Sequence, residues 1–506
     1  MVYFTNNRFI IQGLMFITIG IGCVLPVSNQ AQESREEIQA VPIETTSEAL
    51  ASGIIQGASR RNVVVKPLTL ADAVRTTLVR NRQLGTAFHV QRAAEIGVYE
   101  ARAPFFPSIS YQSTLNKSES EFYDFDMGDV QLPPEFQDSF DFNNFGFTGD
   151  IYTNQFVLQQ LIYDRRVIGN LKLAKLQELA TEWQYRGQKQ DAVYQTVAAY
   201  LEVLRAQELL EVQRQRLNLA TRQLETAERN FEVGMRIRTD VLRAQLSRSS
   251  AQRDVVSAQI AVERAQANLN RIIGVELEDR HALVPGELVS FDPPSYTSHP
   301  FNEINQLFVT ATENHPSVQV AALLVEQNQE SVDIAQGDYY PTVSATGAWG
   351  FRDEGGPNFD KEEWSLTLQM SVPIFEGGRR VAQVQRTQAE LNAEQKRYEE
   401  TVRTILNQVE QNTLALQEED QNLELAQEAV LVALENYDRF LNLYQEGLAD
   451  TLEVTEALTE LVEAQTTVIT TRYNYLSLFA QLLASLGIIP VEAEAYTDTR
   501  WLYVLE

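Results

Sequence analysis

Apolar and polar residues alternate in several short segments of the chain, most regularly in one of them. From Trp364 to Val372 every second residue is apolar or aromatic, and the residues between them are polar. Alternation with a period of two is typical of a strand with one apolar face. The pattern predicts four strands, at about 105–117, 150–162, 339–352 and 363–374. Each has roughly the ~9–11 residues that a tilted strand needs to cross a bilayer.

A seven-residue repeat of apolar residues follows each pair of strands. The repeat comprises Leu210, Leu217, Leu224 and Phe231 in the first half of the chain, and Leu423, Val430, Tyr437 and Tyr444 in the second. It is typical of coiled-coil helices. Because residues 135–284 and 374–489 contain no proline, long helices are expected at 164–230 and 377–443. Each would be roughly 100 Å long at ~1.5 Å per residue.

Two shorter helices are predicted in the first half, over Leu70–Ala103 and Thr239–Gly274. Together they contain about as many residues as one long helix. Stacked end to end they would match its length, because the rise per residue is the same in all α-helices. This arrangement predicts a helical wall of nearly constant height.

The sequence contains an internal duplication. Gly234 aligns with Gly447, and the same offset aligns Gly274 with Gly487. Upstream, Pro107 aligns with Pro341 at a larger offset. The two offsets differ because the first copy holds an extra acidic and aromatic loop at 119–150. Each copy reads as helix, strand, loop, strand, long helix, tight turn and returning helix.

Four strands cannot close a membrane barrel by themselves. The known minimum is about eight strands, and an open sheet edge in lipid leaves backbone groups unpaired. The chain must therefore oligomerise if its strands enter a membrane. The alternative, a small soluble sheet, accounts for the alternation but not for the very long helices beside it.

Charge and the N-terminus indicate the compartment and exclude some partners. The net charge of −28 disfavours nucleic acid as a partner, because a polyanion would be repelled. Arg8 precedes the apolar run Phe9–Val27, which is the layout of a secretory signal peptide at 1–31. The single cysteine, Cys23, lies in this run, so the exported chain would have no disulfide. Whether Cys23 carries a lipid stays open.

The residue types that carry catalysis or bind metals form no recognisable pattern. The four histidines, His89, His281, His299 and His315, lack metal-ligand spacing. The sequence also lacks a G-x-S-x-G motif, a phosphate-binding glycine loop and a C-x-x-C pair. We therefore expect no catalytic site, no cofactor and no bound metal, and a protein that is not an enzyme.

Taken together, these features resemble the TolC family of outer-membrane efflux and secretion channels. The likeness extends over about 68–486, and the doubled order of its motifs is more specific than any single motif. It is carried by the proline-led strands and by paired segments: NRQL (Asn81–Leu84) with NHPSV (Asn314–Val318), FEVGM…TDVLRAQ with YQEGL…LEVTEAL, and the closing RYNYLSLFAQLLASLG (Arg472–Gly487).

The resemblance implies a mixed α and β membrane protein made of duplicated units of strands and long helices. Three chains would form one 12-stranded outer-membrane β-barrel, continued by a periplasmic α-helical barrel with a belt of small elements. The implied segments are a signal peptide (1–31), a flexible N-terminal segment (32–67), a first repeat (68–274), an equatorial linker (275–300), a second repeat (301–487) and a C-terminal equatorial segment (488–506).

The implied function is a passive exit duct of a tripartite efflux or type I secretion system, for small molecules or proteins. The homotrimer would lie in outer-membrane lipid and dock onto a periplasmic adaptor (membrane fusion protein) and an inner-membrane transporter of the RND, ABC or MFS type. The exported substrate and the pump stay open. The alternatives are a periplasmic adaptor, which has one hairpin without this duplication, and a coiled-coil scaffold, which needs no apolar strand face.

The resemblance also assigns residues to three sites. A periplasmic gate would use Asp240 and Tyr444; Ala449 stands where the family has an arginine, which Arg236 or Arg238 would replace. Glu453 and Glu456 share one helical face and would form a pore constriction whose six carboxylates in a trimer attract cations. The adaptor would contact the hairpin tips at Val233, Gly234, Met235, Glu446, Gly447 and Leu448. Simple structural turns and a solvated acidic helix face are the plainer alternatives.

Overall fold

A computed structural model describes residues 66–118, 149–235, 237–276, 281–283, 304–354, 359 and 361–497. Within the chain, residues 65–506 form one compact unit, and the fold described below is that of this unit. Several expectations fall outside the described residues: the signal peptide with Cys23, nearly all of the loop at 119–150, most of the linker at 275–300, and the C-terminus from residue 498. Arg236 is also outside them.

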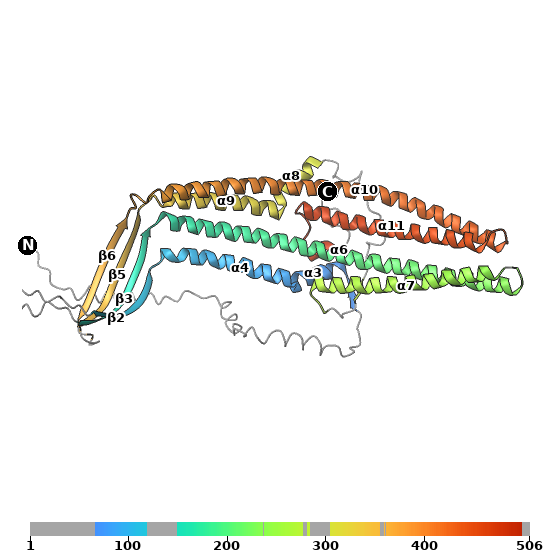
Figure 1. The fold of residues 1–506 in the computed structure, drawn as a ribbon, viewed down its shortest axis with the longest axis horizontal. Coiled ribbons are helices and arrows are strands. Elements are labelled where there is room, and N and C mark those ends of the chain that lie inside the picture. Colours follow the sequence, from blue (N-terminus) through green and yellow to red (C-terminus); the bar gives the residue numbers. More distant parts are fainter. Residues whose placement is uncertain are drawn as a thin grey trace, which may run out of the picture. The chain divides into compact units, whose positions relative to one another are not determined.

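Four antiparallel strands form one sheet in the order β2-β3-β5-β6 (Figure 1). The strands are β2 (Ser108–Ser118), β3 (Gly149–Tyr163), β5 (Thr342–Glu354) and β6 (Glu362–Ser371). Their bounds differ from the predicted ones by a few residues at the ends. Because β3 pairs with β5, the sheet joins the two copies of the duplication. β2 and β6 are its edges.

Two long helices run from the sheet, and each turns back at its far end (Figure 1). They are α6 (Arg165–Glu232) and α10 (Arg379–Gln445), and the returning helices are α7 (Arg238–Ile273) and α11 (Thr451–Ser485). These bounds agree closely with the predicted helices, since no proline interrupts the 68 and 67 residues of the long ones. Among the described residues, no helix is apolar over a length sufficient to cross a membrane.

The single helix expected at Leu70–Ala103 is wrong. The structure has two helices, α3 (Leu70–Arg80) and α4 (Arg82–Arg102), separated by Asn81 in an extended conformation. The Asn81 side chain accepts hydrogen bonds from the backbone N–H groups of Gln83 and Leu84, at 2.9 and 3.1 Å. An asparagine that caps a new helix in this way ends the preceding one, because it competes for the same backbone groups.

Asn81 lies at a joint where α4 and α7 meet end to end. Its Nδ2 donates to the carbonyl of Ile272, near the end of α7, at 2.9 Å. Gly274 follows in the left-handed region at φ 73°, against the backbone carbonyl of Arg80. Stacking is therefore confirmed, but with α4 alone rather than with the whole of 70–103.

The second copy contains the same joint, between α9 (Pro316–Gly337) and α11. His315 caps α9 by accepting from the Ser317 N–H at its Nδ1. Burial lowers the pKa of the His315 imidazole, so the ring is neutral near pH 7 and its Nδ1 can accept. Gly487, at φ 74°, lies against the carbonyl of Asn314. Helix α8 (Ile304–Asn314) precedes this joint as α3 precedes the first.

A belt of small elements surrounds the joints. Strand β1 (Lys66–Leu68) pairs in parallel with β4 (His281–Leu283). Lys66 and Pro67 were expected in the flexible segment, and this assignment is corrected by the pairing. The 3-10 helix η9 (Ala493–Tyr496) contacts α3. The belt therefore contains pieces from both ends of the duplication and from the linker between the two copies.

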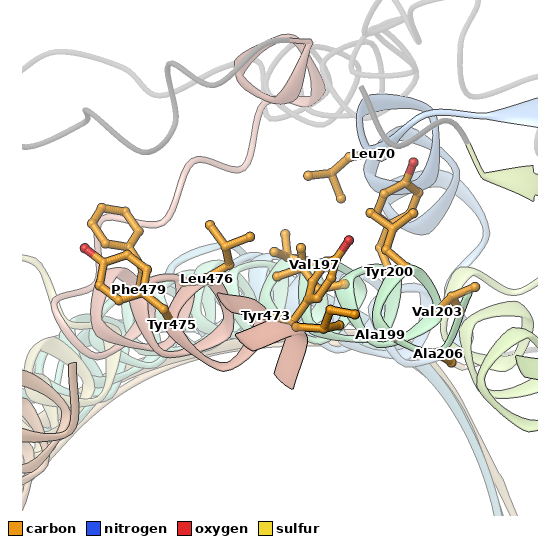
Figure 2. Close-up of a cluster of buried hydrophobic side chains, with 14 of the residues drawn as sticks. Leu70, Val197, Ala199, Tyr200, Val203, Ala206, Tyr473, Tyr475, Leu476 and Phe479 are labelled. Carbon is orange, nitrogen blue, oxygen red and sulfur yellow. The ribbon is translucent and has the colours of Figure 1, made fainter. Parts of the chain in front are cut away.

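The main core lies beneath this belt, where α3 and α11 both pack on α6. Tyr200 of α6 and Tyr475 and Phe479 of α11 are almost completely buried, and Leu70 of α3 lies near Tyr200 (Figure 2). The Tyr200 hydroxyl donates to the backbone carbonyl of Leu68, at 3.1 Å. Large aromatic side chains bury much apolar area, so this cluster fixes the position of the belt on the long helices.

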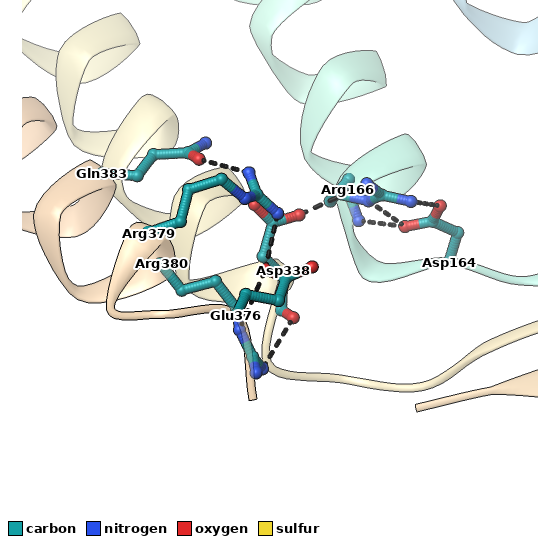
Figure 3. Close-up of polar contacts among 7 residues, drawn as sticks. All are labelled: Asp164, Arg166, Asp338, Glu376, Arg379, Arg380 and Gln383. Carbon is teal, nitrogen blue, oxygen red and sulfur yellow. Dashed lines mark hydrogen bonds and ion pairs between the residues drawn. The ribbon is translucent and has the colours of Figure 1, made fainter. Parts of the chain in front are cut away.

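Charged residues hold the junction between the sheet and the helices (Figure 3). Arg166 donates to the carboxylates of Asp164, at 2.7 Å, and Asp338, at 3.3 Å, which links α6 to the end of α9. The hydrogen bond from Arg166 holds the pKa of Asp164 below its usual value, although burial acts in the opposite direction. In the second copy, Glu376 pairs with Arg379 and Arg380. The Arg166 contacts thus join α6 of the first copy to α9 of the second, and the Glu376 pairs hold the start of α10.

Candidate functional site

Each helical hairpin turns at a glycine with the same backbone geometry. At the first tip, the N–H groups of Gly234 and Met235 donate to the carbonyls of Phe231 and Asn230, at 3.0 and 2.8 Å. This is a Schellman motif, in which glycine adopts the left-handed region that other residues avoid. Gly234 has φ 74°. The tip therefore needs glycine for its conformation and not for lack of space, since a Cβ there would meet no atom within 4 Å.

The second tip repeats this motif. The N–H groups of Gly447 and Leu448 donate to the carbonyls of Tyr444 and Leu443, at 3.1 and 2.9 Å. Gly447 has φ 80° and, like Gly234, no atom within 4 Å of an added Cβ. The two glycines that the duplication aligns thus form the same turn twice.

Apolar side chains project from both tips. Val233 is 68% exposed, Met235 77% and Leu448 74%. Ile237 extends the apolar surface of the first tip, at 66% exposed, and Glu446 is exposed at the second. Apolar residues gathered at an exposed turn are typical of a contact surface. The six residues assigned to the tips therefore lie in two exposed turns, three in each.

The returning helices begin differently. Helix α11 begins with a capping box: Asp450 accepts from the Glu453 N–H at 3.0 Å, and the Glu453 carboxylate accepts from the Asp450 N–H at 2.9 Å. In α7 the corresponding position is Ile237, which has no side-chain cap. The capping box was missed from the sequence, although its D-x-x-E pattern is a known signal.

This capping box separates the two acids assigned to the constriction. Both side chains are exposed, but the carboxylate of Glu453 is held at the start of its own helix. Within the described part of the chain, no hydrogen bond or ion pair holds Glu456. Of the two carboxylates, that of Glu453 is therefore the one engaged by the start of its own helix.

The residues assigned to the gate lie on different hairpins. Asp240 and Arg238 are in the first turn of α7, and Tyr444 is in the last turn of α10. Asp240 and Tyr444 are buried, at 6% and 3% exposed, whereas Arg238 is exposed. Among the described ion pairs, none joins Arg238 to Asp240. Ala449 is buried beside the second tip, at 5% exposed.

Polar contacts that the sequence did not reveal tie the helices together above the tips. Arg216 of α6 pairs with Asp254 of α7, at 2.7 Å, within the first hairpin. Gln223 of α6 donates to the Thr455 hydroxyl of α11, at 3.1 Å, and so connects the two hairpins. Their partners lie 38 and 232 residues away. No local pattern could have identified them.

At the opposite end of the molecule, one row of aromatic residues crosses all four strands. Tyr111 faces Phe156, Phe156 faces Trp349, and Trp349 faces Trp364 in successive strands. All four are well exposed, and the Phe156 and Trp349 rings are stacked with centroids 6.3 Å apart. A band of aromatic side chains is typical of the interface between membrane and water.

The described residues contain no group of three or more histidine, cysteine, aspartate or glutamate side chains that could hold a metal ion. The expectation of no bound metal and no cofactor stays a prediction.

Comparisons with known proteins agree with this architecture. The chain is 25% identical over 348 residues to the alkaline protease secretion protein AprF of Pseudomonas aeruginosa, which covers 68% of each chain. It is 24% identical over 346 residues to the outer membrane protein TolC of Escherichia coli, covering 65% of this chain and 68% of TolC.

Solved structures show the same fold. The Campylobacter jejuni CmeC outer membrane channel superposes with a TM-score of 0.69 at 16% identity, covering 83% of this chain and 85% of CmeC. The outer membrane protein VceC of Vibrio cholerae gives a TM-score of 0.67 at 18% identity, covering 83% of this chain and 96% of VceC.

A match to the model of a protein family identifies the family of the chain. The model described as "Outer membrane efflux protein" matches residues 73–275 and 307–488, which each cover most of one copy of the duplication and together exceed half of the chain. The family consists of channel proteins, so the alternatives of an adaptor and of a coiled-coil scaffold are set aside. The chain belongs to the outer membrane efflux protein family and is a channel of the outer membrane that extends into the periplasm.

Proposed function

We propose that three copies of the chain form the exit duct of an efflux or type I secretion system. The three sheets close one twelve-stranded barrel in the outer membrane, and the long helices continue it as a periplasmic α-barrel. The open edges at β2 and β6 support this proposal, because backbone groups at a sheet edge must be paired within lipid. The aromatic row across the sheet marks one interface of the barrel with water.

The hairpin tips dock onto a periplasmic adaptor, which connects the duct to an inner-membrane transporter of the RND, ABC or MFS type. The observation that carries this proposal is the pair of Schellman turns, each presenting exposed apolar side chains at its end. The name of AprF refers to secretion of a protease, and that of another relative, TtgI of Pseudomonas putida, to toluene efflux. The cargo is accordingly a protein or a small molecule, chosen by the pump.

Photo-crosslinking from the tips tests the docking. A photoreactive residue at Met235 or Leu448 is expected to capture a periplasmic adaptor protein in intact cells, identified by mass spectrometry. The matched control is Ile109, which is also apolar and 65% exposed but lies in β2, within the proposed barrel. Capture of the adaptor from Ile109 as efficiently as from the tips would contradict the docking.

At the periplasmic entrance, Asp240 and Tyr444 form a latch with the basic residues of the first tip, Arg236 or Arg238. Burial of both Asp240 and Tyr444 on separate hairpins supports a contact role, because a buried acid is costly unless it has a partner. Position 449, where the family resemblance implies an arginine, is alanine here, so in this proposal the cation comes from the other hairpin. Glu453 and Glu456 line the constriction just above.

Weakening the latch is expected to open the channel. Asp240→Asn and Tyr444→Phe remove a charge and a hydroxyl while keeping the shape of each side chain. In planar bilayers, the open probability should rise several-fold for either variant, since a buried hydrogen bond is worth about 1 kcal/mol or more. Asp438→Asn is the control, because Asp438 is an exposed acid of the same helix as Tyr444. Unchanged gating in both variants would remove these residues from the latch.

A further inference from the structure

The corresponding helices α4 and α9 of the two copies of the duplication have different numbers of long helices packed against them. Helix α9 packs against both α6 and α10, whereas α4, its counterpart in the first copy, packs on only one of these two, α6 (Figure 1). Burial differs accordingly. Helix α4 buries only Leu84 and Val98, whereas α9 buries Pro316, Val318, Ala321, Gln327, Glu330, Val332, Ala335 and Gly337. One flank of α4 is therefore left without the neighbour that its counterpart has.

The flank of α9 that packs against α6 shows which contacts such a neighbour makes. Gly187 of α6 approaches Pro316 at the start of α9 so closely that a Cβ on Gly187 would lie 3.1 Å from the Pro316 Cβ. One turn further along α6, Gln190 donates from its Nε2 to the carbonyl of Gly487, at 2.7 Å. Both contacts lie at the joint between α9 and α11.

The duplication indicates which residues of α10, α4 and α7 occupy the positions that make these contacts in α6, α9 and α11. The offset that aligns the two tip glycines takes Gly187 to Glu400 and Gln190 to Arg403, both on α10, and relates Gly487 to Gly274. The larger offset of the proline-led strands relates Pro316 to Arg82, at the start of α4. Glu400, Arg403 and Arg82 are all exposed in one chain. Glu400 and Arg82 carry opposite charges.

We propose that α10 of each subunit packs against the α4–α7 joint of the next subunit. In this contact Glu400 pairs with Arg82 of the partner subunit, and Arg403 donates to the carbonyl of Gly274 of the partner subunit. This inference rests on the proposed homotrimer and specifies the register of its interface. A guanidinium suits the end of α7, because the last carbonyls of a helix carry partial negative charge. The two surfaces differ, so the contact is head to tail and closes a ring.

The charges of Glu400 and Arg82 determine the register of the contact between subunits more than they increase its affinity. An exposed ion pair contributes about 0–1 kcal/mol, whereas like charges at the same position oppose the contact. The internal joint uses a glycine and a proline where the joint between copies uses Glu400 and Arg82. The opposite charges of Glu400 and Arg82 favour pairing between subunits in this register over registers in which α10 is shifted along α4.

A disulfide between copies tests the register. In a Cys23→Ser background, which has no other cysteine, Glu400→Cys is combined with Arg82→Cys. A close Cβ approach, as at the internal joint, falls near the separation that a disulfide requires, so oxidation should link the chains into a ladder ending at three on non-reducing gels. The control pairs Glu400→Cys with Arg92→Cys, ten residues along α4 and roughly 15 Å away, and should give about tenfold less product.

Charge exchange gives a second measurement that does not depend on cysteine. Glu400→Arg should lower the temperature at which the trimer dissociates in mild detergent, and adding Arg82→Glu should restore it. Arg403→Gln, which introduces the residue used at the internal joint, should be tolerated, whereas Arg403→Glu should not.

The outcomes separate this inference from the proposed function. A ladder from the first cysteine pair alone, with restoration by the charge exchange, supports the register. Equal or absent ladders in protein that still migrates as a trimer on native gels overturn the register and leave the trimer in place. Unsubstituted protein that is monomeric on native gels overturns the trimer itself.

Discussion

Gly487→Ala is expected to lower the melting temperature of the protein far more than Gly447→Ala. Both glycines adopt a positive φ, 74° and 80°, which costs an alanine about 1–2 kcal/mol. At Gly447 an added Cβ would meet no atom within 4 Å. At Gly487 it would lie 2.6 Å from the Asn314 carbonyl oxygen, so the α9–α11 joint must move apart. The difference should be about 1–3 kcal/mol or more, as for overpacking against a rigid backbone.

Helical circular dichroism of the detergent-solubilised protein during heating measures this difference. Gly447→Ala is the matched control, because it shares the backbone conformation but not the close approach. Gly274→Ala should behave like Gly487→Ala, since its Cβ would lie 2.5 Å from the Arg80 carbonyl oxygen. Similar melting temperatures for Gly487→Ala and Gly447→Ala would show that the α9–α11 joint accommodates an added Cβ without loss of stability, and would contradict the prediction.

Glu456→Lys is expected to abolish the cation preference that the proposed constriction would give the channel. In a trimer the substitution changes the charge at the constriction by six, and a ring of lysines favours anions. The cation-to-anion permeability ratio should fall by about an order of magnitude or reverse. Glu456→Gln, which only removes the charge, should give an intermediate ratio.

Glu453→Gln provides the contrast. Its carboxylate accepts from the Asp450 N–H, so its removal should cost helix stability, about 1 kcal/mol, more than selectivity. Reversal potentials in planar bilayers under a salt gradient measure the selectivity of each variant. A larger shift for Glu453→Gln than for Glu456→Gln would contradict the assignment of Glu456 as the carboxylate that faces the ions.

Most of the architecture could be predicted from the sequence because it is repetitive. The period of two located the strands, and the absence of proline located the long helices within a few residues. The break at Asn81 was missed because its neighbours continue the helical pattern, and only contacts from Gln83 and Leu84 make it a cap. The pairing of β1 with β4 joins the segments that flank the first copy, which no local pattern predicts.

The candidate sites were located from family resemblance rather than from physical patterns. The glycines of the tips were visible because a lone glycine interrupts a long helical run. The contacts that position the hairpins, such as Arg216 with Asp254 and Gln223 with Thr455, depend on how helices pack and were not visible. The capping box at Asp450 has a local signal, the D-x-x-E pattern, but was not among the predictions.

The first turns of the two returning helices are held with different strength. An N-cap contributes about 0.5–2 kcal/mol. Helix α11 has one with a reciprocal partner, whereas the N-cap residue of α7, Ile237, makes no side-chain cap. Local opening of a helix end costs least where caps are missing. The first turn of α7, which carries Arg238 and Asp240, therefore unwinds more readily than the corresponding turn of α11. A partner that engages both tips would meet its lower resistance at the first hairpin.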